Sequence, residues 1–192
     1  MPLPAENARY TFADSLTWED DERAEIIQGE PVMLATPSRL HQEILTALVA
    51  QLYNFLEGKQ CKVYPAPFAV RLFAKKDDTP EETDTVVEPD ISVVCDGSKL
   101  DQYGCKGAPD LVIEILSPST QRHDRLVKLG LYSKAGVKEY WIVSPEEKTV
   151  QVMLQDKGKG LQLHEVYGEK DVAKVNVLSG CFIELERVFP LA

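Results

Sequence analysis

Two apolar segments joined by a helical pattern constrain the fold of this chain more than any other feature. The segments are PDLVIEILS at 109–117 and EYWIVS at 139–144, both rich in β-branched or aromatic residues. Between them, the residues from about His123 to Ala135 have helical spacing and are followed by Gly136, a residue that commonly ends helices. A strand, a helix and a second strand in this order predict a crossover unit.

The rest of the chain reads as strands around one long helix. Residues 24–34 predict an N-terminal hairpin around Gln28 and Gly29, and residues 38–57 repeat apolar side chains at helical spacing. Residues 86–95 predict a second central strand that is covered on both faces, and residues 74–85 an exposed loop. The segments 149–155, 161–168 and 181–189 predict short antiparallel strands. Without a repeat or linker, we expect residues 1–192 to form a single domain.

Composition and charge limit the classes of function. The chain is 44% hydrophobic and 27% charged, which is typical of a soluble globular protein. No segment approaches the length that a bilayer requires, and the first residues do not resemble a secretion signal, so we expect no membrane contact and a cytoplasmic protein. The net charge of −10 argues against holding nucleic acid by general electrostatics. An acidic chain that cuts DNA needs a local basic patch, a divalent metal or a partner.

The cysteines show no metal-binding pattern. Cys61, Cys95, Cys105 and Cys181 form no CxxC pair, and no histidine cluster accompanies them. This disfavours a zinc site. In a chain of this size without a secretion signal, we predict that the cysteines are small buried side chains with free thiols.

Glu114 is the informative exception within an apolar strand. Strand alternation places it on the same face as Val112 and Leu116, which we expect to be covered. Burying an ionised carboxylate without a partner costs several kcal/mol at least, so a metal, a cation or a proton must compensate. The alternative is a glutamate at a strand end that reaches solvent or an arginine.

Asp90 and Lys128 extend this hypothesis. Asp90 follows Pro89 at the start of the 91–94 strand, where it is either a turn residue or a second carboxylate beside Glu114. Two carboxylates on adjacent strands can hold a hard cation such as Mg²⁺. Helical projection places Lys128 near Leu131, so its ammonium either points towards the carboxylates or extends to the surface.

The order and spacing of these segments resemble the Uma-type putative restriction endonuclease family, which has the PD-(D/E)xK nuclease fold. The resemblance covers residues 12–189 approximately and is most specific between Glu114 and Trp141. The matching pieces there are Ser117-Pro118-Ser119, Asp124-Arg125, Lys128-Leu129, Tyr132, Gly136-Val137 and Glu139-Tyr140-Trp141. It implies an α/β (α+β) fold, with a mixed central sheet flanked by helices, an N-terminal hairpin and C-terminal antiparallel strands.

The resemblance also implies roles for residues. Asp90 matches the PD aspartate and Glu114 the acid of (D/E)xK, but Leu116 occupies the usual lysine position, so the lysine role moves to Lys128 on the following helix. Glu25 and His41 match further family positions. Glu25 either adds a carboxylate to the metal site or is a solvated edge residue, whereas for His41 a packed histidine at a helix start is the favoured interpretation.

The predicted chemistry is the hydrolysis of DNA phosphodiester bonds with Mg²⁺ or Mn²⁺, by a homodimer. Asp90, Glu114 and the backbone carbonyl of Ile115 hold the metal in this hypothesis, and Lys128 acts on the attacking water. The cluster of Arg122, His123 and Arg125 at the helix entrance either binds phosphate or is simply solvated. The alternatives are an inactive nuclease-like interaction module, and a metal-dependent hydrolase of another phosphate ester.

Overall fold

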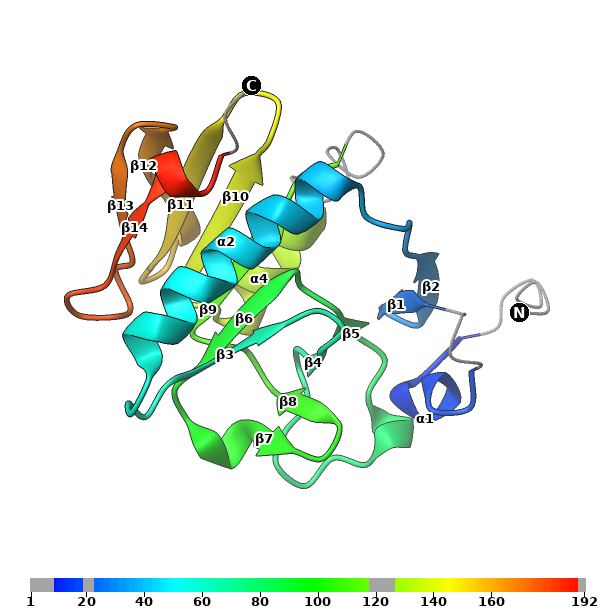
Figure 1. Ribbon diagram of the computed structural model, residues 1–192. Coiled ribbons are helices and arrows are strands. Elements are labelled where there is room, and N and C mark those ends of the chain that lie inside the picture. Colours follow the sequence, from blue (N-terminus) through cyan, green and yellow to red (C-terminus); the bar gives the residue numbers. More distant parts are fainter. Residues whose placement is uncertain (1–8, 19–22, 118–126, 190–192) are drawn as a thin grey trace.

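The computed structural model describes residues 9–18, 23–117 and 127–189. Within them, strands form two six-stranded sheets and one two-stranded sheet (Figure 1). The first sheet has the order β2-β1-β5-β4-β8-β7 and contains β1 (Ala24–Ile27), β2 (Glu30–Met33), β4 (Ala69–Arg71), β5 (Val86–Val87), β7 (Leu100–Asp101) and β8 (Gly104–Lys106). The second has the order β12-β11-β10-β9-β6-β3 and contains β3 (Lys62–Pro65), β6 (Ile91–Val94), β9 (Leu111–Ile115), β10 (Glu139–Ser144), β11 (Thr149–Asp156) and β12 (Gly160–Gly168). The two-stranded sheet pairs β13 (Val172–Lys174) with β14 (Phe182–Glu184).

The part of the chain that the structure describes contains few helices. They are α1 (Phe12–Ser15), α2 (Arg39–Leu56) and α4 (Leu129–Ala135), with short 3₁₀ turns η1 (Pro80–Glu82), η2 (Gly97–Lys99) and η4 (Leu185–Arg187). Figure 1 shows α2 lying across one face of the second sheet and α4 on the other. In the described parts of the chain, no helix is long and apolar enough to span a membrane.

The predicted crossover unit is confirmed. β9 and β10 are parallel, with Leu111 beside Glu139, and α4 lies between them in the sequence. The other neighbours in this sheet pair antiparallel, so the sheet is mixed, as predicted. Gly136 ends α4 with a φ of 86°, a left-handed conformation that a side chain would disfavour. Only the C-terminal part of the predicted 123–135 helix lies within the described residues.

Two apolar cores cover β9 on both faces, which explains its continuous burial. On one face, Ile44 and Leu48 of α2 pack in the same core as Ile113. On the other, Val112 packs in a second core with Leu131 of α4. A side chain such as Glu114, which alternates onto the second face, is therefore taken out of water.

The N-terminal hairpin is also present, as β1 and β2. Its turn residues Gln28 and Gly29 have φ values of 52° and 83°, the left-handed pair that favours a tight hairpin. The 74–85 segment is less exposed than expected, since it contains η1 and buries Thr83 and Thr85. The Thr83 carbonyl accepts a hydrogen bond from the Phe12 backbone N–H at 2.8 Å, which draws this segment against α1.

The prediction of four free thiols is wrong for Cys61 and Cys95, which form a disulfide. The antiparallel register of β3 and β6 pairs Lys62 with Val94. Cys61 directly precedes Lys62 and Cys95 directly follows Val94, so the register places the two cysteines opposite each other. Cys105 and Cys181 are buried and free, in agreement with the prediction.

Candidate active site

Glu114 lies on β9 with only 4% of its surface exposed. Its Oε1 accepts a hydrogen bond from Lys128 Nζ at 3.0 Å and another from the Tyr132 hydroxyl at 2.5 Å. A cation and a neutral donor thus compensate for the burial of the carboxylate, as its position in the strand requires.

Lys128 immediately precedes α4 and also contacts a carboxylate from the N-terminal hairpin. Its Nζ lies 3.0 Å from Oε1 of Glu25, a residue of β1 that is 1% exposed. The same Glu25 oxygen accepts a hydrogen bond from the Glu88 backbone N–H at 2.9 Å. One buried ammonium therefore joins two buried carboxylates that come from different sheets, and we refer to Glu25, Glu114 and Lys128 as the ionic cluster.

Tyr132 completes the surroundings of Glu114. Burial raises the pKa of the Tyr132 hydroxyl well above its ordinary range, and the nearby charges of Glu114 and Glu25 raise it further. The hydroxyl therefore stays protonated and remains a donor to Glu114. The sequence pattern did not indicate this role of Tyr132, although its position four residues after Lys128 places both on one face of the helix.

Asp90 lies at the start of β6, beside the strand that carries Glu114. Its Oδ2 accepts a hydrogen bond from the Ile115 backbone N–H at 2.7 Å and lies 3.1 Å from His41 Nε2. The antiparallel register pairs Ile91 with Ile113, so one further step along it brings Asp90 opposite Glu114. The register thus places the two acids opposite each other at one end of this strand pair.

The structure shows where the side chains of His41 and Glu25 lie. His41 is a helix-start histidine in the first turn of α2, 8% exposed, and it contacts Asp90 rather than the apolar core alone. Glu25 is not a solvated edge residue, because it is buried against Lys128. Arg122, His123 and Arg125 lie outside the described residues.

The donor atoms suit a hard divalent cation bound by few protein ligands. Asp90 Oδ1 has no hydrogen-bond partner among the described residues, and its side chain is 19% exposed. No group of three or more histidine, cysteine, aspartate or glutamate side chains able to hold a metal occurs in the described ranges. Mg²⁺ usually takes one or two carboxylates and completes its shell with water and substrate phosphate, so a site built on Asp90 and Glu114 fits it.

Residues 88–90 connect the two sheets and carry groups of the site. They join β5 of the first sheet to β6 of the second. The Glu88 N–H binds Glu25, the Glu88 carboxylate accepts from Arg23 at 2.6 Å, and Asp90 follows two residues later. This short link therefore fixes the hairpin and Asp90 relative to each other.

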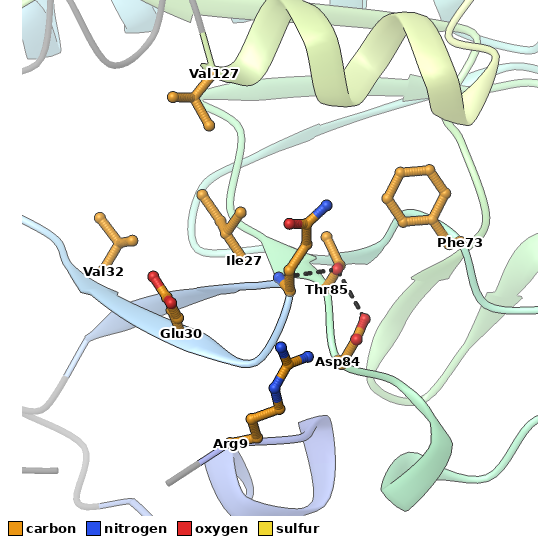
Figure 2. Close-up of a pocket in the computed structure, with 9 residues that line it drawn as sticks. Arg9, Ile27, Glu30, Val32, Phe73, Asp84, Thr85 and Val127 are labelled. Atoms are coloured by element: carbon orange, nitrogen blue, oxygen red, sulfur yellow. Dashed lines mark hydrogen bonds between the residues drawn. The ribbon is translucent and has the colours of Figure 1, made fainter. Parts of the chain in front are cut away.

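A pocket of about 610 Å³ opens next to the ionic cluster. Val127, which directly precedes Lys128, lines it together with Ile27, two residues beyond Glu25. Figure 2 shows the apolar side chains of Val127, Ile27 and Phe73 in the upper half and the charged side chains of Asp84 and Arg9 in the lower half. The pocket thus has an apolar side and a charged side.

Comparison with known proteins identifies relatives of this chain in sequence and in fold. The model of the family described as "Uma2: Putative restriction endonuclease" matches residues 12–186. An uncharacterized protein of Synechocystis sp. (strain ATCC 27184 / PCC 6803 / Kazusa) is 29% identical over 132 residues, or 67% of this chain. The match spans 65% of the length of that curated relative.

A solved structure shares the fold. The crystal structure of a "putative nuclease belonging to DUF820" from Anabaena variabilis ATCC 29413 superimposes with a TM-score of 0.67 at 20% identity. The match covers 94% of this chain and 97% of that chain. At this identity the similarity shows the fold alone, and it agrees with the predicted restriction endonuclease-like architecture.

Proposed function

The chain belongs to the Uma2 family of putative restriction endonucleases, and from this premise we propose that it is a metal-dependent endonuclease that hydrolyses phosphodiester bonds in DNA. The observation that carries the proposal is the buried contact of Lys128 with both Glu25 and Glu114, at 3.0 Å each, beside the strand end that holds Asp90. A fixed cation in contact with Glu114, on the strand next to Asp90, is suited to charge that develops on a phosphate.

Asp90 and Glu114 are the proposed protein ligands of Mg²⁺ or Mn²⁺, with the Ile115 backbone carbonyl as a third. When bound, such a cation supplies Lewis acidity and lowers the pKa of water. The Ile115 N–H already binds Asp90 at 2.7 Å, so the same residue would hold the aspartate and add a ligand.

The side chains of the chain itself have separate roles in the proposal. Lys128 supplies positive charge towards the phosphate, at a place where burial strengthens its electrostatic effect. Tyr132 and His41 are positioning residues: the first donates to Glu114 and the second contacts Asp90. Each acid is thereby held in one orientation before substrate arrives, which lowers the cost of reorganisation in the transition state.

DNA binding requires positive charge that the chain as a whole does not provide, since its net charge is −10. We propose that Arg122, His123 and Arg125, which precede Lys128 in the sequence, supply part of it. A homodimer would place two sites on the two strands of a duplex, and we propose this assembly because two-fold enzymes suit a near-symmetric substrate. We further propose that the protein acts in the cytoplasm.

Cleavage of plasmid DNA in the presence of Mg²⁺ or Mn²⁺ tests the proposal. We expect nicking by the wild type, and a loss of about a hundredfold or more in Glu114→Gln and Asp90→Asn. Glu165→Gln, an exposed residue of β12, is the matched control and should cleave at the wild-type rate. Equal activity in all three variants would show that a contaminant cuts the DNA.

The acidic charge favours a second candidate, a nuclease-like fold that serves as an inactive interaction module. In that case the wild type neither nicks DNA nor gains thermal stability from Mn²⁺. Cleavage of a small phosphodiester, but not of DNA, would instead indicate a hydrolase of another phosphate ester.

A further inference from the structure

We propose that the pocket beside the ionic cluster binds a nucleobase that carries an exocyclic amino group and has been turned out of the base stack. This inference depends on the proposed function for the polymer to which the base belongs. It assigns a role to the hairpin turn and to the segments that follow β4 and precede β5, whose residues line the pocket.

The size and shape of the pocket suit a small planar ligand. A volume of about 610 Å³ lies within the usual range for pockets that bind small molecules. Phe73 and Val127 leave 43% and 38% of their surfaces exposed, although both are apolar, and they come from distant parts of the sequence. Uncovered aromatic and aliphatic side chains provide the stacking surface that extruded bases use.

The polar side of the pocket selects the class of base. Asp84 and Glu30 contribute carboxylates, which accept hydrogen bonds from amino groups such as N4 of cytosine. The Thr85 hydroxyl is already engaged, since it accepts from the Gln28 N–H at 3.2 Å and donates to Asp84 at 2.9 Å. Among the described residues, the side chains of Glu30 and Gln28 make no hydrogen bond, so they remain available to a ligand.

The charge balance agrees with a base rather than a phosphate. Two carboxylates and one guanidinium, from Asp84, Glu30 and Arg9, give this side of the pocket a net charge of −1, which repels an anion. A neutral base with amino donors meets no such repulsion. The phosphate that follows the base in the chain would then lie towards Lys128, because Val127 adjoins both the pocket and the ionic cluster.

The backbone around the pocket is well ordered by its own contacts. The Gly29 N–H donates to the Asp84 carbonyl at 2.7 Å, and the Tyr10 N–H donates to the Gly29 carbonyl at 2.9 Å. A Cβ added at Gly29 would lie 3.2 Å from Cβ of Arg9, so the hairpin turn is closely covered by this residue. The pocket is therefore formed before a ligand enters it, which reduces the cost of binding.

Metal-free binding of short single-stranded DNA tests the proposal without cleavage. Three oligonucleotides that differ only at one central position, with cytosine, thymine or an abasic site, are titrated into the wild type by fluorescence anisotropy. We expect the cytosine oligonucleotide to bind at least about fivefold more tightly than the abasic one, since stacking of a base on an aromatic side chain has effects of this size. The thymine oligonucleotide should fall between them.

Variants separate stacking from hydrogen bonding. Phe73→Ala should remove the advantage of cytosine over the abasic site, and Asp84→Asn should remove its advantage over thymine while stacking remains. Phe182→Ala, which replaces a phenylalanine that is 57% exposed on β14, is the control and should bind like the wild type. Thermal melting checks that each variant is folded.

The outcomes distinguish this proposal from the proposed function. Equal binding of the three oligonucleotides, or equal effects of Phe73→Ala and Phe182→Ala, would overturn the base pocket even if plasmid DNA is cleaved. Selective binding of cytosine that depends on Phe73 supports the pocket even if no cleavage is found, and the endonuclease proposal would then fail alone.

Discussion

Replacing Lys128 by methionine should strongly destabilise the protein, because two carboxylates would lose the cation that they share. Lys128 is 4% exposed and its Nζ lies 3.0 Å from Oε1 of both Glu25 and Glu114. Removing one partner from a buried ion pair costs about 3–5 kcal/mol, chiefly because an uncompensated buried charge remains. For a chain of 192 residues, each kcal/mol lowers the Tm by about 2–4 °C, so we expect a decrease of roughly 6–20 °C.

Glu25→Gln provides the internal test of this reasoning. The amide keeps an acceptor for the Glu88 N–H and leaves Lys128 paired with Glu114, so alone it should cost only about 1–3 kcal/mol. Combined with Lys128→Met it should be less harmful than the sum of the two single changes, because one of the two repelling carboxylates is gone. Urea unfolding of the four proteins gives this coupling energy directly.

A matched surface change completes the design. Lys157→Met alters an exposed lysine in the β11–β12 turn and should leave the Tm within about 1 °C of the wild type. If Lys128→Met melts no lower than Lys157→Met, or if the double variant is strictly additive, the ionic cluster does not stabilise the fold as argued.

Three further predictions concern Tyr132, Cys105 and the Cys61–Cys95 disulfide. Tyr132→Phe should cost about 1–3 kcal/mol in urea unfolding, because Glu114 loses a buried donor. Burial raises the pKa of the Cys105 thiol from 9.0 to about 11, so its contribution to stability is complete below pH 9 and is lost as the pH rises through 11. Cys105→Ala should therefore flatten the fall in Tm between pH 9 and 11. An unchanged slope would contradict the raised pKa of Cys105. Reducing the Cys61–Cys95 disulfide, which closes a loop of 34 residues, should lower stability by about 2–4 kcal/mol, whereas Cys61→Ser should no longer respond to reductant.

Sequence reasoning predicted the parts of the fold whose patterns are local. The crossover of β9, α4 and β10 follows from apolar runs on either side of a helical period, and the hairpin follows from Gln28-Gly29. The short strands β7, β8 and β13 were missed, because two or three residues do not show a periodicity. The division of the strands into two large sheets depends on long-range pairing, which no local pattern reveals.

The candidate site likewise combines features that follow from a local pattern with contacts that depend on long-range pairing. The position of Glu114 within an apolar strand required a compensating group, and the structure brings Lys128 to it. The contact of Lys128 with Glu25 joins residues more than a hundred positions apart, so only the family resemblance indicated Glu25. The Cys61–Cys95 disulfide was missed for a related reason, since the register of β3 and β6 alone places these residues opposite each other. The roles of Asp90, Glu114 and Lys128 in catalysis stay predictions.

The link between the two large sheets limits how this chain can change during evolution. On one side of Pro89, the Glu88 N–H binds Glu25 of the first sheet, and on the other side Asp90 binds the Ile115 N–H of the second sheet. A shift of one residue along the backbone would break either contact. An insertion or deletion at 88–90 would either break the hydrogen bond from Glu88 to Glu25 or move the Asp90 carboxylate away from the candidate site. The turn at 157–159, which joins β11 to β12, makes neither of these two contacts. We therefore expect insertions and deletions among active relatives in turns such as 157–159 rather than at residues 88–90.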